Sequence, residues 1–92
     1  MQLEWRVEYS DTALKSLKKL SRKNPQLIDE IMDYLDEVAA LGDPFARGKA
    51  LKSNLAGRWC YRVKDYWIIC QIDNGLLLIT ALNVGHRSTI YE

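Results

Sequence analysis

The amino-acid sequence predicts an α+β fold, in which a small, mostly antiparallel sheet carries two helices on one face. Two segments of the first half repeat apolar residues with a helical period, whereas the second half alternates or runs apolar as strands do. An alternating segment at the start adds an N-terminal strand to a three-stranded meander. Elements in this order form two layers around one core. We expect one domain, residues 1–92, because 92 residues leave no room for a second.

The first predicted strand covers residues 3–9, where apolar and charged side chains alternate. Side chains of a strand point in turn to its two faces. One face carries Leu3, Trp5, Val7 and Tyr9, and the other carries Glu4, Arg6 and Glu8. We therefore expect a half-buried strand.

The first helix is expected to follow this strand directly. Ser10 and Asp11 offer side-chain oxygens that cap its start. Its inward residues are Leu14, Leu17 and Leu20, and lysines occupy the remaining face.

The second helix is expected to begin with Asn24 as its cap and Pro25 in its first turn, where a missing N–H costs nothing. It runs to about Leu41 and stops at Gly42. Its buried stripe comprises Leu27, Ile28, Ile31, Met32, Leu35, Val38 and Ala39.

The meander begins with a strand over residues 59–63, in which tryptophan, tyrosine and valine alternate with polar residues. It turns near Lys64 and Asp65 into a strand over residues 66–72. The sequence Asp73-Asn74-Gly75 then predicts a hairpin whose asparagine and glycine take positive φ angles. The apolar run after it, residues 76–84, is expected to be a strand that is covered on both faces or central in its sheet, and that Gly85 ends.

The composition excludes several classes of protein. No segment approaches the roughly 20 apolar residues of a membrane span, and the first four residues lack the layout of a signal peptide. We expect a soluble, cytoplasmic protein with no membrane partner. Cys60, Cys70 and the single His86 do not supply the three or four ligands of a zinc site, so we expect no metal and no cofactor. The two cysteines either approach each other across paired strands or remain free thiols, as a reducing cytoplasm favours.

The charges are segregated although the net charge is only +1. Such segregation creates local potentials that the total hides. The second helix carries an acidic cluster, Asp29, Glu30, Asp33, Asp36 and Glu37. The segment 44–64 contains no acidic residue but has Arg47, Lys49, Lys52, Arg58, Arg62 and Lys64. A second basic cluster, Lys15, Lys18, Lys19, Arg22 and Lys23, is either a solvated helix face or a contact for ribosomal RNA.

Three strings of the sequence, in this order, resemble those of RelE toxins from bacterial toxin–antitoxin pairs. They are Gly48-Lys49-Ala50-Leu51-Lys52, then Arg62-Val63-Lys64-Asp65-Tyr66, then Val84-Gly85-His86-Arg87 followed by Tyr91. The family strings read G-K-x-L-x-G, then W-R-Y-R-V-G-D-Y-R, then V-G-H-R and a tyrosine. The resemblance implies a compact domain like that of small microbial ribonucleases. It also implies cleavage of messenger RNA in the ribosomal A site, whereas ParE relatives poison DNA gyrase.

The chemistry of RNA cleavage agrees with this resemblance. Attack by a neighbouring 2′-hydroxyl requires removal of its proton, neutralisation of the phosphorane charge and protonation of the leaving oxygen. A basic sheet face also attracts the phosphate backbone, and aromatic rings stack on unpaired bases. The resemblance implies catalytic roles for Arg62, Arg87, Tyr91 and Lys52 and RNA-binding roles for Lys49, Arg47, Lys64 and His86.

We expect Arg62 and Lys64 to share one strand face and to converge with Arg87 on a phosphate. Tyr91 is expected to stack on or orient a base, or to carry a proton. Each residue also has a plain structural interpretation. The arginines and lysines suit an exposed surface, His86 is either a general base or a strand-end cap, and Tyr91 lies where chain ends fray.

Three positions depart from the family strings. Cys60 and Trp67 stand where the family usually has arginine, and Lys64 replaces the glycine before the aspartate. Loss of one electrostatic stabiliser often lowers a rate by about 100-fold or more. We therefore expect a toxin whose cleavage activity is weakened.

Two alternatives to the ribosome-dependent endoribonuclease remain open from the sequence. One is a gyrase-inhibiting toxin of the ParE kind, and the other is a catalytically degenerate module that only binds its antitoxin. In each case we expect a cognate antitoxin, encoded by a neighbouring gene, to lay an amphipathic helix or strand across the toxin and cover basic residues. The ribosome and messenger RNA are the further partners of the first interpretation.

Overall fold

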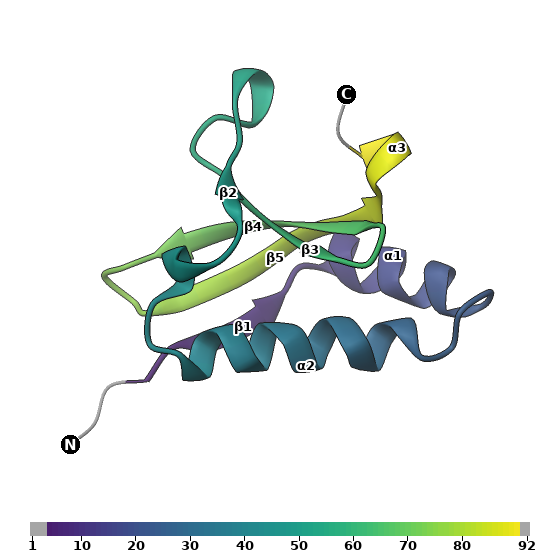
Figure 1. The fold of residues 1–92 in the computed structure, drawn as a ribbon, viewed down its shortest axis with the longest axis horizontal. Helices are drawn as coiled ribbons and strands as arrows, with labels where there is room; N and C mark the ends of the chain where they lie inside the picture. The colour runs from purple at the N-terminus through teal and green to yellow at the C-terminus, as the bar shows by residue number, and fades with distance from the viewer. Residues whose placement is uncertain (1–3, 91–92) are drawn as a thin grey trace.

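Five strands form one mixed sheet in the computed structural model, which describes residues 4–90. The strand order is β1-β5-β4-β3-β2, with β1 parallel to β5 and the other neighbours antiparallel. The strands are β1 (Arg6–Tyr9), β2 (Lys49–Ala50), β3 (Trp59–Val63), β4 (Tyr66–Asp73) and β5 (Leu78–His86). Helices α1 (Asp11–Ser21) and α2 (Leu27–Ala40) cover one face of the sheet (Figure 1). The predicted α+β class is confirmed, whereas the short elements β2 and α3 (Arg87–Ile90) were not predicted.

Strand β1 has the predicted alternation, although it begins at Arg6 rather than at residue 3. Leu3 lies outside the described residues. Trp5, Val7 and Tyr9 pack against the core. The strand pairs with β5 in the register Arg6↔Leu78.

The first helix begins as predicted, but the prediction that Leu14 faces inward is wrong. The Ser10 hydroxyl accepts a hydrogen bond from the Ala13 amide at 3.0 Å and so caps α1. Ala13 and Leu17 are buried, whereas Leu14 is 44% exposed. Ala13 therefore takes the inward position that the sequence assigned to Leu14.

Helix α2 starts two residues later than the sequence predicted. Its N-cap is Gln26, which makes no side-chain capping bond, so the assignment of Asn24 as cap is wrong. Pro25 lies before the helix, where the Leu27 amide donates to the Asn24 carbonyl at 3.0 Å. The buried stripe is confirmed: Leu27, Ile31, Leu35 and Val38 are buried, with Ile28, Met32 and Ala39 packed beside them.

The end of the meander differs from the prediction in two details. Between β4 and β5 the positive φ falls on Leu77, at 52°, and not on Asn74 or Gly75. The Asp73 carboxylate instead accepts from the Leu76 amide at 3.0 Å, which shapes a longer loop. Gly85 does not end β5, because pairing continues to His86 opposite Tyr66.

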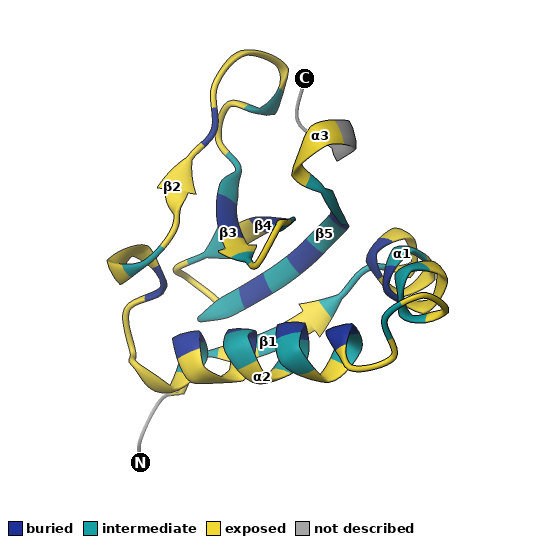
Figure 2. Ribbon diagram, turned by 45° about the vertical axis from the view of Figure 1, so that its right-hand side comes forward, coloured by how far each residue is buried: buried dark blue, intermediate teal, exposed yellow. Residues whose placement is uncertain are grey.

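The two faces of the sheet carry different apolar clusters. The helix face, which α1 and α2 cover, holds the larger one, with Tyr61, Ile68, Cys70, Ile79, Ala81 and Val84 from the strands. The open face, on the other side, carries a smaller one of Leu51, Cys60 and Ile69. Figure 2 shows buried residues alternating with intermediate ones along β5 and lining the sheet side of α2.

The two cysteines are free and buried. Cys60 pairs with Ile69 and Cys70 with Trp59, so the cysteine side chains belong to clusters on opposite faces. The expectation that they approach each other across the strands is therefore wrong, and the alternative of two free thiols is confirmed.

No helix within residues 4–90 has the length and apolar character that crossing a membrane requires.

Candidate nucleic-acid interface

The open face lies between two projections of the chain. The loop 51–58, which contains the 3₁₀ turn Ser53–Leu55, rises from β2 and β3 on one side. Helix α3 rises from the end of β5 on the other, and both point away from α1 and α2 (Figures 1 and 2). Charged and aromatic side chains of β2, β3 and β4 therefore occupy a surface that neither long helix covers.

A shallow pocket of about 300 Å³ marks the β2–β3 side of this face. Strand pairing places Lys49 opposite Cys60, and Arg62 opposite Trp67. The Lys49 ammonium lies 4.5 Å from the centroid of the Trp67 ring. The pocket is lined by Tyr34, Gly48, Lys49, Cys60, Arg62 and Trp67.

Gly48 allows β2 to approach β3 this closely. Its φ is +81°, and a Cβ atom there would lie 2.5 Å from the Cys60 carbonyl oxygen and 2.6 Å from the Trp59 Nε1. Both a left-handed backbone and the lack of a side chain are therefore required. The Trp59 indole donates to the Arg47 carbonyl at 2.7 Å, which holds the same corner.

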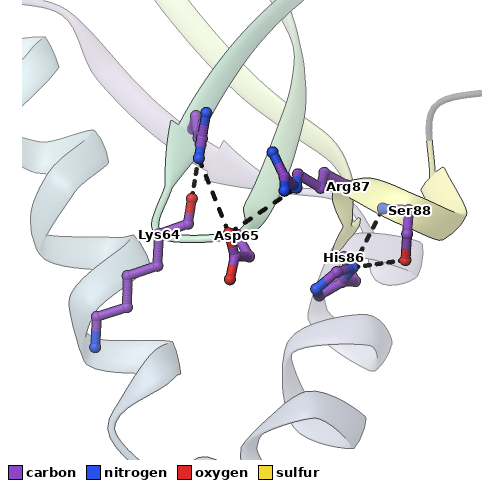
Figure 3. Close-up of polar contacts among 6 residues, drawn as sticks. Lys64, Asp65, His86, Arg87 and Ser88 are labelled. Carbon is purple, nitrogen blue, oxygen red and sulfur yellow. Dashed lines mark hydrogen bonds and ion pairs between the residues drawn. The ribbon is translucent and has the colours of Figure 1, made fainter.

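Two arginines meet at one carboxylate at the other end of the face (Figure 3). Asp65 Oδ1 lies 3.9 Å from Arg62 Nη2 and 4.0 Å from Arg87 Nε. Arg62 Nε also donates to the Lys64 carbonyl at 2.8 Å, and the Arg87 amide to the Asp65 carbonyl at 2.9 Å. Both side chains remain exposed, at 58% and 54%. The arrangement gathers two guanidinium groups around one negatively charged position.

Lys64 is not on the open face. It adopts a φ of 55° in the β3–β4 turn, and its ammonium lies 2.8 Å from the Glu30 carboxylate on α2. Figure 3 shows this side chain extending away from Asp65 toward the helix. The expectation that Lys64 shares a strand face with Arg62 is therefore wrong, because the turn rotates it to the helix side.

Arg47 and Lys52 flank β2. Arg47 pairs with Glu37 at 3.2 Å and lies 5.7 Å above the Tyr34 ring, so it bridges the β2 side of the sheet to α2. Lys52 is exposed and precedes the 3₁₀ turn of the projecting loop. Neither side chain joins the Arg62–Asp65–Arg87 group, and the catalytic role of Lys52 and the RNA contact of Arg47 stay predictions.

His86 lies at the end of β5 with a defined hydrogen-bond partner. The Ser88 amide donates to His86 Nδ1 at 3.2 Å, and the Ser88 hydroxyl lies 2.7 Å from the same atom (Figure 3). An accepting Nδ1 carries no proton, so the neutral ring carries its proton on Nε2. The ring also packs edge-on against Tyr66. In this state Nε2 is a hydrogen-bond donor and is not available as a base. Tyr91 lies outside the described residues.

Sequence reasoning missed three features of this face. It gave no role to Asp65, to the contact between Lys49 and Trp67, or to the missing side chain of Gly48. The glycine carried a usable signal, since it precedes two residues that form an unpredicted strand. The Asp65 and Trp67 contacts depend on cross-strand register, which the sequence does not display.

The pKa of Cys60 depends on its burial and on the nearby Lys49. Burial raises the pKa of this thiol to about 11, while the Lys49 ammonium lowers it. The thiol is therefore protonated and unreactive near neutral pH. Within residues 4–90, no group of three or more histidine, cysteine or acidic side chains is placed to hold a metal ion.

A larger depression, of about 440 Å³, lies between β1 and α2. The charged residues that line it, Glu4 and Asp36, are acidic. Its electrostatic character opposes a phosphate ligand, so the open face is the better nucleic-acid site.

Comparisons with known proteins identify the family of this chain. The sequence matches the family described as the ParE toxin of type II toxin–antitoxin systems, parDE, over residues 7–91. Toxin RelG of Mycobacterium tuberculosis (strain ATCC 25618 / H37Rv) is 29% identical over 94 residues, covering 98% of this chain and 99% of the relative.

Solved structures show the same fold. A chain of the toxin–antitoxin complex RelBE2 from Mycobacterium tuberculosis has a TM-score of 0.79 at 25% identity, covering 96% of this chain and 97% of that one. YafQ from E. coli strain BL21(DE3) has a TM-score of 0.71 at 17% identity, with 97% of this chain and 100% of YafQ covered. Because the family match spans most of the sequence, this chain belongs to the ParE toxin family and is a type II toxin of the RelE/ParE superfamily.

Proposed function

We propose that this toxin is a ribosome-dependent endoribonuclease that cleaves messenger RNA in the A site and so inhibits translation in the cytoplasm. The observation that carries the proposal is the convergence of Arg62 and Arg87 on one anionic position of the open face. RNA cleavage through the 2′-hydroxyl builds negative charge on the phosphate. Two fixed guanidinium groups stabilise such charge more in the transition state than in the ground state.

The remaining roles follow from the neighbouring residues. His86 presents Nε2–H as a hydrogen-bond donor, which suits stabilisation of the charge that develops on the leaving 5′-oxygen. Lys49, Lys52 and Arg47 extend the positive surface along β2 and its loop, where they attract the phosphate backbone. Tyr91 keeps its predicted role against a base or a proton.

The activity is expected to be weaker than that of a face with arginine at position 67. Trp67 lies directly opposite Arg62 and fills the place where a third guanidinium would stand. One electrostatic stabiliser is typically worth about 100-fold in rate.

Mapping of messenger RNA ends on ribosomes with a defined A-site codon tests the proposal. The wild type is expected to cut only when ribosomes are present. Arg62→Gln and Arg87→Gln are each expected to lower the rate by about 100-fold, while Trp67→Arg raises it. Arg6→Gln is the matched control, because Arg6 is an exposed arginine on β1 that pairs only loosely with Glu8, at 4.0 Å.

The same experiment separates the alternatives. Cleavage by Trp67→Arg but not by the wild type would indicate that the fold is correct and that the wild-type open face lacks a charge that cleavage requires. Absence of cuts by every variant would reject the nuclease. The match to the ParE family favours gyrase inhibition as the second candidate, and replication arrest without translation arrest on induction would identify it.

We also propose that a cognate antitoxin, encoded by a neighbouring gene, holds this toxin inactive. RelBE2 is a toxin–antitoxin complex, and its toxin-like chain shares the fold of this protein. An antitoxin that covers the open face would pair with Arg62 and Arg87, so Arg62→Glu is expected to weaken the complex. Titration calorimetry with the purified neighbouring gene product measures this, and no affinity for the wild type would refute it.

A further inference from the structure

We infer that Lys49 and Trp67 together form a phosphate-binding subsite for RNA, in which Lys49 contacts the phosphate and Trp67 is the positioning residue that holds its ammonium. The inference rests on the proposed function only in taking RNA as the ligand. It assigns a role to Trp67, which stands where the family strings usually have a positively charged arginine.

The geometry of the pair carries the inference. The Lys49 ammonium lies 4.5 Å from the Trp67 ring centroid, well inside the roughly 6 Å within which the ring quadrupole attracts a cation. Tryptophan is the strongest of the aromatic partners for such a contact. The two residues come from strands β2 and β4, which β3 separates, so the lysine stem crosses the strand that carries Cys60 and Arg62.

The backbone fixes where this lysine begins. Lys49 pairs with Cys60, and Gly48 lets its strand lie against β3 because a side chain there would overlap the Cys60 carbonyl. Both ends of the Lys49 side chain are therefore held, one by strand pairing and the other by the ring. A lysine held in this way loses less rotamer entropy when it meets a phosphate than a freely rotating one does.

The place of the holding partner decides which side of the sheet each cation reaches. The carboxylates of Glu30 and Glu37 draw Lys64 and Arg47 toward α2. The Lys49 ammonium instead lies beside the Trp67 ring of β4. Trp67 also lies opposite Arg62, so the subsite and the Arg62–Asp65–Arg87 group adjoin along one strand pair. One RNA strand can therefore bring a phosphate to each.

A double-mutant cycle on RNA binding tests the subsite. The probe is a short single-stranded oligouridine with 2′-O-methyl riboses, which binds but cannot be cut through the 2′-hydroxyl. The set is wild type, Lys49→Met, Trp67→Leu and the double variant, measured by fluorescence anisotropy over a range of salt concentrations. Trp67→Phe and Lys49→Arg preserve a weaker or altered cation–π contact, and Lys15→Met on α1 removes an equal charge elsewhere.

Lys49→Met is expected to lower the affinity and to reduce the salt dependence by about 0.7 in the log–log slope, one phosphate contact for a single strand. Trp67→Leu is expected to lower the affinity about fivefold when Lys49 is present, and by less than about twofold in the Lys49→Met background. Trp67→Phe recovers part of the loss. Lys15→Met is expected to leave the contribution of Lys49 to the log–log salt dependence unchanged.

Additive losses in the cycle would overturn the inference, because Trp67 would then act independently of the lysine. An unchanged slope for Lys49→Met, or no binding by the wild type at low salt, would also overturn it. These outcomes are independent of the ribosome assay. Coupled RNA binding without cleavage would leave the subsite standing and reject the nuclease, and cleavage with an additive cycle would do the reverse.

Discussion

The two faces of this sheet are made from the same strands but differ in burial and in charge. The helix face buries Tyr61, Ile68 and Ile79 completely against α1 and α2. Among the described residues, the cluster that the open face buries is Leu51, Cys60 and Ile69, and exposed charges surround it. Most of the apolar core is on one side, and the exposed charges surround the smaller cluster on the other.

Strand β3 shows the contrast within three residues. Tyr61 is fully buried, and its hydroxyl donates to the Pro44 carbonyl. Its neighbours Cys60 and Arg62 point to the open face beside Lys49 and Trp67. Because adjacent strand residues point to opposite faces, a substitution here should affect either folding or binding, and rarely both.

The largest expected effect lies in the core of the helix face. Leu35 on α2 is fully buried, so Leu35→Ala is expected to lower the free energy of unfolding by about 2–5 kcal/mol, by loss of apolar contact and creation of a cavity. Urea denaturation followed by circular dichroism measures it. Leu14→Ala, at an exposed leucine of α1, is the control and should cost far less. Equal losses would mean that the two positions are not distinguished by burial.

Gly48→Ala is expected to disturb the pairing of β2 with β3 on the open face. The new Cβ would overlap the Cys60 carbonyl at a backbone φ of +81°, so we expect a loss of about 1–3 kcal/mol in unfolding free energy. Gly42→Ala is a matched control, because its φ is +78° but no atom lies within 4 Å of the added Cβ. The difference between the two variants isolates the steric contribution, and no difference would contradict the close approach of β2 to β3.

High pH should weaken the open-face cluster through Cys60. The pKa of this thiol is about 11 in the fold against an ordinary 9.0. The folded state therefore retains the proton more strongly, and this stabilisation is complete below pH 9.0 and is lost as the pH rises through about 11. Cys60→Ala is expected to lose less stability than the wild type over this range, by on the order of 1–2 kcal/mol. Urea denaturation under reducing conditions at both ends of the range tests it, and parallel pH profiles would refute it.

The smallest effect on stability is expected at Asp65. Its ion pairs with Arg62 and Arg87 are long and exposed, so Asp65→Asn should change the unfolding free energy by less than about 1 kcal/mol. The carboxylate competes with phosphate for the same guanidinium groups, however. The variant is therefore expected to bind oligouridine more tightly at low salt. Asp29→Asn on α2 is the control for net charge, and tighter binding by both variants would assign the effect to charge alone.

Much of the fold was predictable because apolar periodicity is a local property. The stripe of α2 and the alternation of β1 and β3 follow from it directly. The errors lie where long-range contacts decide. Leu14 matches the helical pattern, yet it is exposed because Ala13 faces β5. Two-residue β2 is too short to leave a periodic signal.

The candidate site was predictable in its residue types but not in its geometry. The positive character of Arg62 and Arg87 was evident from the sequence, and the structure brings them together. The assignment of Lys64 to the same face failed because one positive φ in a turn redirects it to Glu30. From the sequence, Trp67 indicated only the loss of an arginine that the family usually has. The structure places the Lys49 ammonium over its ring.

The parallel pairing of β1 with β5 sets the order in which the toxin is completed during its own synthesis. The Ser10 hydroxyl donates to the Leu82 carbonyl 72 residues later in the chain, and within residues 4–90 the strand that pairs with β1 is β5. A chain synthesised from its N-terminus therefore exposes β1 and the helix pair before β5 and Arg87 have been made. Contacts between such distant segments also form slowly. The topology thus delays assembly of the open face until β5 and Arg87 have been synthesised.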